Sequence, residues 1–167
     1  MVVAETDRLR IRWFDAHDAA FILELLNEPS WIRYIGNRNV KTLADAGRYL
    51  ESGPLGMYER LGFGLYMVES KRDAEPMGMC GLIKRDSLEH VDLGFAFLPR
   101  FWRNGYAFEA ASAVMQYGRD VMGLTRVVAI LSQDNERSAR LLERLGFRLE
   151  GTVAHDKEVL ILYASAS

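Results

Sequence analysis

The fold of this chain is decided by residues 90–110, which read HVDLGFAFLPRFWRNGYAFEA. From 90 to 98, bulky apolar residues stand at the odd positions and mostly smaller or polar residues at the even ones. This alternation predicts a strand with two different faces. Pro99 ends the strand, residues 100–105 form a short polar loop, and the apolar spacing from Tyr106 predicts a long helix to about Met122. The apolar side of that helix is expected to hold Ala107, Ala111, Val114, Met115 and Val121 or Met122.

The segments on either side extend this unit into a mixed sheet. Residues 126–131 form an apolar strand after the helix, and a strand–helix–strand succession makes its two strands parallel. The closely spaced strands upstream indicate an antiparallel meander. In chain order, the predicted strands cover residues 9–13, 63–69, 77–84, 90–98, 126–131, 147–152 and 158–164. Further helices are predicted from Asp15 to Leu26, from Thr42 to Glu51 and from Asn135 to Leu145, the last with a left-handed cap at Gly146. We therefore expect an α/β fold, with about six or seven strands in a mixed sheet and helices on both faces.

Length and composition indicate an ordinary globular protein. The 167 residues fit one domain, expected to span 1–167, with 49% apolar and 26% charged residues. The formal net charge of -2 gives no overall basic field, so a nucleic-acid partner is not expected. There is no signal-like start and no run near the roughly 20 apolar residues that span a bilayer, so we expect a cytoplasmic protein without a membrane partner. The single cysteine, Cys80, excludes an internal disulfide, is expected in a core strand, and leaves no expected metal site.

The loop before the long helix has the features of an anion site. The first-turn amides of a helix lack intrahelical acceptors and lie at the positive end of its dipole. Gly105 permits close backbone approach, Ala107 keeps the first turn uncrowded, and Arg100 and Arg103 add local positive charge. The alternative is a plain strand-to-helix turn with two solvated arginines. Nucleoside triphosphates and dinucleotides are disfavoured, because neither the P-loop pattern nor the dinucleotide glycine pattern is present.

Residues 92–95 together with 102–110 resemble the acetyl-CoA motif of the GNAT N-acetyltransferase superfamily. The family pattern is Gln/Arg-x-x-Gly-x-Gly/Ala; this chain has Trp102 at the first position and matches at Gly105 and Ala107. Tryptophan is common at that position in one branch of the family, and in this respect the chain resembles the ribosomal-protein N-terminal (RimJ/RimL-like) acetyltransferases. Further segments similar to that branch are residues 6–12, 135–138 and 145–147.

This resemblance implies an enzyme that moves an acetyl group from acetyl-CoA to a primary amine by direct attack in a ternary complex. The amine would belong to a peptide N-terminus or a small molecule; related domains use ribosomal N-termini, polyamines, antibiotics and amino acids. In the family, the two parallel strands splay apart to admit the co-substrate, and loop amides wrap its pyrophosphate. The residues implied to bind acetyl-CoA are Phe97, Leu98, Trp102, Arg103, Asn104, Gly105, Tyr106, Ala107, Asn135 and Ser138. A homodimer is compatible with the resemblance. The alternative function is a coenzyme A-binding sensor or scaffold without turnover.

Asp92 is the candidate base for the amine proton. It lies on the less bulky face of its strand with Gly94 and Ala96, which leave room for a thin ligand arm. In many relatives a glutamate at this position acts on the amine, often through water. The alternative is a solvated or salt-bridged carboxylate at the strand end. His90 projects from the same side and is expected at the surface.

Ser138 is the candidate that assists the leaving thiolate. By resemblance, Asn135 binds the pantetheine arm and Ser138 reaches the sulfur. The alternative is that both residues only cap the helix, which Asn135 is well placed to begin. Many relatives use a tyrosine instead, for which Tyr106 and Tyr163 are available. The acceptor pocket is expected in the first half of the chain, among the core-type aromatics Trp31, Tyr34, Tyr49, Tyr58, Phe63 and Tyr66.

Overall fold

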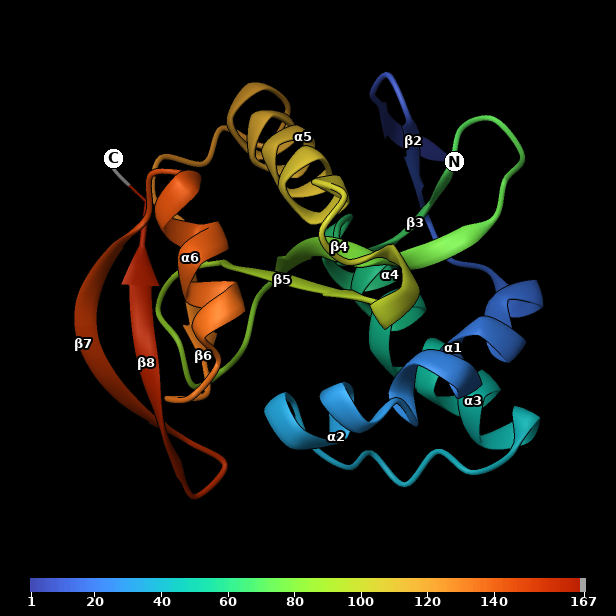
Figure 1. Cartoon of the computed structure of the whole chain (residues 1–167), viewed down its shortest axis with the longest axis horizontal. Helices are drawn as coiled ribbons and strands as arrows, with labels where there is room; N and C mark the ends of the chain where they lie inside the picture. The colour runs from blue at the N-terminus through green and yellow to red at the C-terminus, as the bar shows by residue number, and fades with distance from the viewer. Residues whose placement is uncertain (166–167) are drawn as a thin grey trace.

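The computed structural model describes residues 1–165 and shows one continuous mixed sheet (Figure 1). Its strands within that range are β1 (Val2–Glu5), β2 (Leu9–Arg12), β3 (Leu65–Ser70), β4 (Pro76–Ile83), β5 (Asp92–Phe97), β6 (Val128–Leu131), β7 (Arg148–His155) and β8 (Glu158–Ala164). They are arranged in the order β1-β2-β3-β4-β5-β6-β8-β7. Every neighbouring pair is antiparallel except β5 and β6, which are parallel as predicted. The sheet therefore has eight strands where six or seven were expected.

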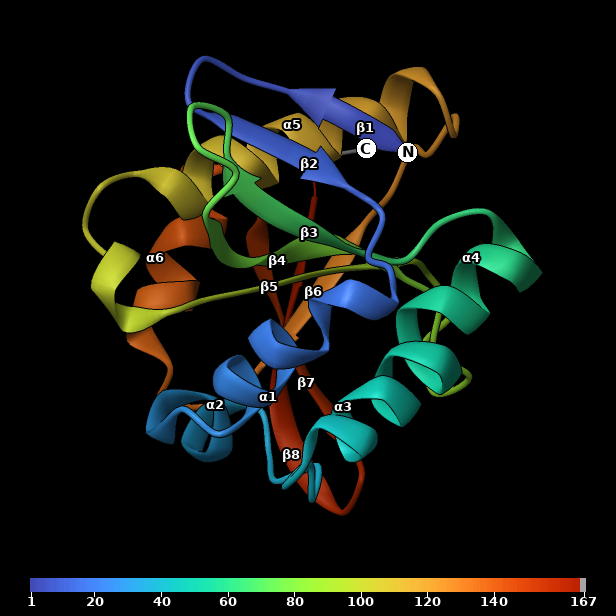
Figure 2. The same ribbon diagram turned by 90° about the vertical axis from the view of Figure 1, so that its right-hand side faces the viewer.

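Helices cover both faces of the sheet, as expected (Figure 2). Their bounds are α1 (Ala19–Leu26), α2 (Pro29–Tyr34), α3 (Leu43–Leu50), α4 (Gly56–Leu61), α5 (Tyr106–Asp120) and α6 (Glu136–Arg144). Alternate residues of β3 divide the core into two. Tyr66 and Val68 pack in the cluster that contains α5 and α6, whereas Met67 packs in the cluster that contains α1, α2 and α3. The alternation of side chains along a strand thus gives each helical layer its own core.

Local capping signals set most helix ends where the sequence predicts them. Asp15 and Thr42 each form a capping box with the residue three positions later. Gly146 ends the α6 turn with φ +92°, a left-handed conformation that glycine adopts without a Cβ penalty. On α5, Ala111, Val114 and Met115 are buried as predicted. Of the alternatives Val121 and Met122, Met122 packs against the core, whereas Val121 follows the last helical residue and is 66% exposed.

The differences from prediction are short elements. Strand β1, Val2-Val3-Ala4-Glu5, lacks the alternation of apolar and polar residues that β2 shows, and it forms by pairing with β2. Helix α1 ends at Leu26 as predicted, and Pro29 then begins a short helix, α2, that was not predicted, at a first position where its missing N–H costs nothing. A second short helix that was not predicted, α4, follows a break at Gly53, where the backbone angles are non-helical. Strand β5 begins at Asp92 rather than at His90.

The parallel strands β5 and β6 touch at one end only. The single paired register joins Asp92 to Val128, and the amide of Val128 donates to the carbonyl of Val91 at 3.0 Å. Figure 1 shows β5 then running across the molecule while β6 turns away beside β8. Asp92 therefore lies at the point where the two strands diverge.

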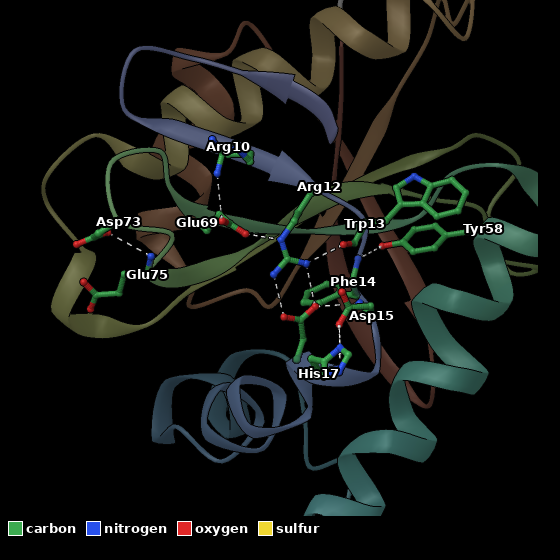
Figure 3. A network of polar contacts seen from close by, with 11 residues as sticks. Arg10, Arg12, Trp13, Phe14, Asp15, His17, Tyr58, Glu69, Asp73 and Glu75 are labelled. Carbon is green, nitrogen blue, oxygen red and sulfur yellow. Dashed lines mark hydrogen bonds and ion pairs between the residues drawn. The ribbon is translucent and has the colours of Figure 1, made fainter. Parts of the chain in front are cut away.

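A buried polar network joins the N-terminal strands to α1 (Figure 3). The guanidinium of Arg12 donates to both carboxylate oxygens of Asp18, at 2.9 and 3.0 Å, and to Glu69 on β3. Asp18 and Glu69 are 8% and 4% exposed. Buried carboxylates need such partners, because desolvation of an unpaired charge is costly. Arg12 thus links β2, β3 and the turn that leads into α1.

Candidate functional site

A cavity of about 360 Å³ opens between the diverging strands β5 and β6. Its remaining walls come from α2 and the loop after it, α3, the first turns of α6 and the β7–β8 turn. The cavity thus borders both helical layers and both halves of the sheet. Of the predicted catalytic and binding residues, Asp92, Asn135 and Ser138 line it together.

Asp92 is a buried, ion-paired carboxylate. It is 1% exposed, and the Nε of Arg85 lies 3.2 and 3.3 Å from its two carboxylate oxygens. Burial raises the pKa of Asp92 above its ordinary value, although the charge and hydrogen bond of Arg85 act in the opposite direction. The predicted alternative, a salt-bridged carboxylate at the strand end, is therefore present in the structure. A carboxylate with a raised pKa that lines a cavity can also act as a base.

Asn135 and Ser138 lie at the start of α6. The side-chain oxygen of Asn135 accepts from the amide of Ser138 at 3.3 Å, so Asn135 does cap the helix. This bond uses the Ser138 amide and leaves its hydroxyl without a hydrogen-bond partner among residues 1–165. The hydroxyl can therefore donate to a group in the cavity that both residues line.

The predicted anion loop lies beside the cavity rather than in its lining. Gly105 precedes α5 with φ +79°. The amides of Arg103 to Phe108 have no backbone acceptor within residues 1–165. Asn104 donates its side-chain amide to the carbonyl of Trp102 at 3.0 Å, which fixes the loop from within. Free amides at a helix N-terminus are the arrangement that binds phosphate groups.

Trp102 connects this loop to β5 and to α6. Its indole N–H donates to the carbonyl of Phe97 at 2.9 Å, and the guanidinium of Arg137 lies 3.7 Å from the centre of its ring. The side chains of Phe97 and Leu98 are buried in the two cores. Ligand contact at these two positions would therefore involve the main chain. Ala107 packs against the core at the first turn of α5.

The two tyrosines considered as acids do not line the cavity. The Tyr163 hydroxyl donates to Glu143 at 3.4 Å, and the Tyr106 ring lies under the guanidinium of Arg8 at 4.3 Å. Of the aromatics in the first half, Trp31, Tyr34 and Tyr49 line the cavity. Tyr58, Tyr66 and Phe63 pack in or against the core and do not line the cavity, whereas Trp31 does both.

Two further cavity residues, Arg85 and His155, were not predicted. Arg85 follows β4 and His155 ends β7, and their side chains come within 3.5 Å of each other. No local pattern in the sequence marks either residue, because each gains its importance from a neighbour on another strand. His90 lies outside β5 and is not among the cavity-lining residues.

The described residues contain neither a metal cluster nor a membrane-spanning helix. No group of three or more His, Cys, Asp or Glu side chains in residues 1–165 could hold a metal ion. No helix in that range is long and apolar enough to cross a bilayer. Cys80 is fully buried, and burial raises the pKa of its thiol.

Comparisons with known proteins identify the family. The sequence pattern of the acetyltransferase (GNAT) domain matches residues 8–148. The uncharacterized N-acetyltransferase YoaA of Bacillus subtilis is 31% identical over 153 residues, which cover 90% of this chain and 85% of YoaA. A GNAT-family acetyltransferase from Bacillus anthracis has a structure with a TM-score of 0.81 at 26% identity, covering 99% of this chain and 98% of that one. The fold also matches that of RimL, a ribosomal L7/L12 α-N-protein acetyltransferase solved with coenzyme A, with a TM-score of 0.84 at 16% identity and coverage of 99% and 98%. The chain therefore belongs to the GNAT family and is an acetyltransferase.

Proposed function

We propose that this protein transfers an acetyl group from acetyl-CoA to a primary amine, by direct attack within a ternary complex. The observation that carries the proposal is the cavity at the divergence of β5 and β6, where Asp92 and Ser138 face the same space beside a loop with free amides. Holding two substrates in one cavity supplies much of the rate of such a reaction. We also propose that residues 1–167 act as one catalytic domain, since the sheet is continuous from β1 to β7.

Binding of acetyl-CoA is assigned to the loop and to the start of α6. The amides of Arg103 to Ala107 would hold the pyrophosphate, with Trp102 and Asn104 shaping the loop around it. The side-chain N–H₂ of Asn135 remains available for the pantetheine arm, because only its oxygen caps the helix. Gly94 and Ala96 of β5 line the cavity and leave space for that arm.

The transfer step divides the acid and base roles between Asp92 and Ser138. The amine nitrogen bonds to the thioester carbonyl carbon, and the carbon–sulfur bond then breaks. Asp92 accepts the proton that the amine loses, directly or through water, and the Ser138 hydroxyl donates a hydrogen bond to the departing thiolate. Proton transfer to a positioned base contributes roughly 10²–10⁴-fold. A hydrogen bond that strengthens only as the thiolate departs is expected to contribute roughly one to two orders of magnitude. Asp92 suits this role because burial brings its pKa nearer to the pH at which an amine reacts.

A thiol-release assay tests the proposal. Acetyl-CoA would be offered with spermidine, a peptide with a free N-terminal alanine, an aminoglycoside and a free amino acid. We expect amine-dependent thiol release with one class, and an acetylated product by mass spectrometry. Tight coenzyme A binding by calorimetry, without thiol release for any amine, would favour the sensor or scaffold instead.

A further inference from the structure

Arg85 is the one cationic side chain that touches Asp92 among the described residues. Its Nε faces both carboxylate oxygens at 3.2 and 3.3 Å. The Arg85 side chain is 28% exposed and that of Asp92 only 2%. A carboxylate this deeply buried would take up a proton and cease to be a base unless a positive charge favoured its ionised form.

The turn that carries Arg85 is itself fixed. The ammonium group of Lys84 donates to the carbonyl of Arg85 at 2.7 Å and to the carbonyl of Leu88. Leu88 is buried against Val128 and Ala164, on β6 and β8. The backbone on both sides of Arg85 is therefore anchored to the strands that frame the cavity.

The guanidinium of Arg85 also contacts His155, at the end of β7. One terminal nitrogen lies 3.5 Å from Nε2 of His155, whose Nδ1 lies 3.0 Å from the hydroxyl of Ser87. The same Nε2 lies 3.3 Å from a carboxylate oxygen of Asp156. The β7–β8 hairpin thus places His155 and Asp156 beside the guanidinium that faces Asp92.

We propose that Arg85 is a positioning residue of the acetyl-transfer reaction, orienting the Asp92 carboxylate and keeping it ionised so that it can accept the proton of the acceptor amine. This inference rests on the proposed function. Arg85 acts through Asp92 and is assigned no contact with substrate. The other charged or titratable groups around the cavity are Tyr34 of α2, Arg38 after it, Tyr49 of α3, and His155, Asp156 and Glu158 of the β7–β8 hairpin.

A titration without substrate tests the contact. The side-chain carboxyl ¹³C resonance of Asp92, identified by its loss in Asp92→Asn, would be followed against pH. Arg85→Gln removes the charge and should move the Asp92 midpoint up by roughly one pH unit or more. Arg85→Lys should restore part of the shift. Arg38→Gln is the matched control, because it removes a charge from the same cavity without contacting Asp92 and should move the midpoint less.

A pH–rate profile tests the role in turnover. With saturating acetyl-CoA and the panel amine that wild type accepts, the acid limb of kcat/KM for Arg85→Gln should move up together with the Asp92 midpoint. Thermal melting of each variant identifies unfolding. A purely structural role predicts instead an equal loss of rate at every pH.

The outcomes separate the two proposals. An unmoved midpoint in Arg85→Gln, or an equal shift in Arg38→Gln, overturns the role of Arg85. A midpoint that moves while the acid limb stays in place removes Asp92 as the base and Arg85 with it, although acetyl transfer itself stands. Failure of the proposed function would be seen separately, as the absence of thiol release by wild type.

Discussion

At the scale of single residues, Ser138 and Asp92 share one cavity but have different surroundings. Ser138 has a free hydroxyl at a helix start, whereas Asp92 is buried and ion-paired. A hydroxyl that stabilises a developing thiolate acts mainly in the transition state. A buried carboxylate acts through its protonation, which depends on pH.

The Ser138→Ala variant should therefore lower kcat and kcat/KM together, by roughly one to two orders of magnitude. Acetyl-CoA affinity, measured by calorimetry, should barely change, because the loop amides and Asn135 remain. Ser112→Ala on α5 lies outside this cavity and is the control. A Ser138→Ala enzyme whose KM rises while kcat stays unchanged would limit Ser138 to binding.

The Asp92→Asn variant should depress the rate most near neutral pH. Because burial raises its pKa, Asp92 ionises at a higher pH than an ordinary aspartate, and wild-type activity should rise as the pH passes through that raised value. The variant should lack this acid limb and recover partly at high pH, where the free amine is abundant. Parallel wild-type and variant profiles would leave deprotonation to solvent.

The raised pKa of Asp92 affects folding stability in the opposite direction to activity: the contribution of Asp92 to stability falls as the pH rises. Below the ordinary aspartate pKa, Asp92 is protonated in both the folded and unfolded states. Between the ordinary and the raised value the folded state binds more protons, so the contribution of Asp92 to stability falls as the pH rises. Asp92→Asn should lack this part of the pH dependence in thermal melts.

At the scale of elements, the loop before α5 and the turn after α6 each depend on a left-handed glycine. Gly105 has φ +79° and Gly146 has φ +92°, and a Cβ at either would meet no atom closer than 3.5 Å. Valine at these positions is strained by backbone conformation rather than by contact, at about 1–2 kcal/mol. Valine should therefore cost similar backbone strain at Gly105 and at Gly146. The two positions differ in that only Gly105 lies in the loop proposed to bind the pyrophosphate.

Gly105→Val should weaken coenzyme A binding at least about tenfold in calorimetry, because a distorted loop turns its free amides away from the pyrophosphate. Gly146→Val should lose similar stability in melting curves and keep its coenzyme A affinity. Equal affinities in wild type and Gly105→Val would remove the loop from the binding site.

Over the molecule as a whole, Arg12 joins two strands of the sheet to the helical layer that begins with α1. It pairs with Asp18 before α1 and with Glu69 on β3, and both carboxylates are buried (Figure 3). Removal of one partner from a buried pair leaves an uncompensated charge, which costs more than the pair itself contributes.

The Arg12→Leu variant should lose about 3 kcal/mol of stability. For a chain of this size that corresponds to a fall in Tm of roughly 6–12 °C. Arg33→Leu breaks an exposed pair with Asp134, in which the side chains are 65% and 60% exposed, and should change stability by less than about 1 kcal/mol. Comparable shifts in the two variants would mean that the Arg12 network does not hold the N-terminal elements.

Much of the fold could be predicted from the sequence because its signals depend on interactions between neighbouring residues. Strand period, capping at Asp15 and Thr42, and the left-handed end at Gly146 each depend on a few neighbouring residues. The succession of seven strands along the chain and the parallel pair follow from those local patterns. Strand β1 did not, because its residues Val2-Val3-Ala4-Glu5 do not alternate and the strand forms through its pairing with β2.

The sequence was therefore enough to predict all the longer elements, the loop before α5 and, through the family resemblance, one site that contains Asp92, Asn135 and Ser138. The contacts of Arg85 with Asp92 and with His155, 70 positions further along the chain, became visible only in the folded protein. The folded protein also shows which aromatics reach the cavity, among them Trp31, which belongs to the core as well. The difference follows from the distance along the chain over which each interaction acts. Periodicity and helix caps involve a few neighbouring residues, whereas ion pairs and cavities are formed by side chains that meet only when distant strands pack together.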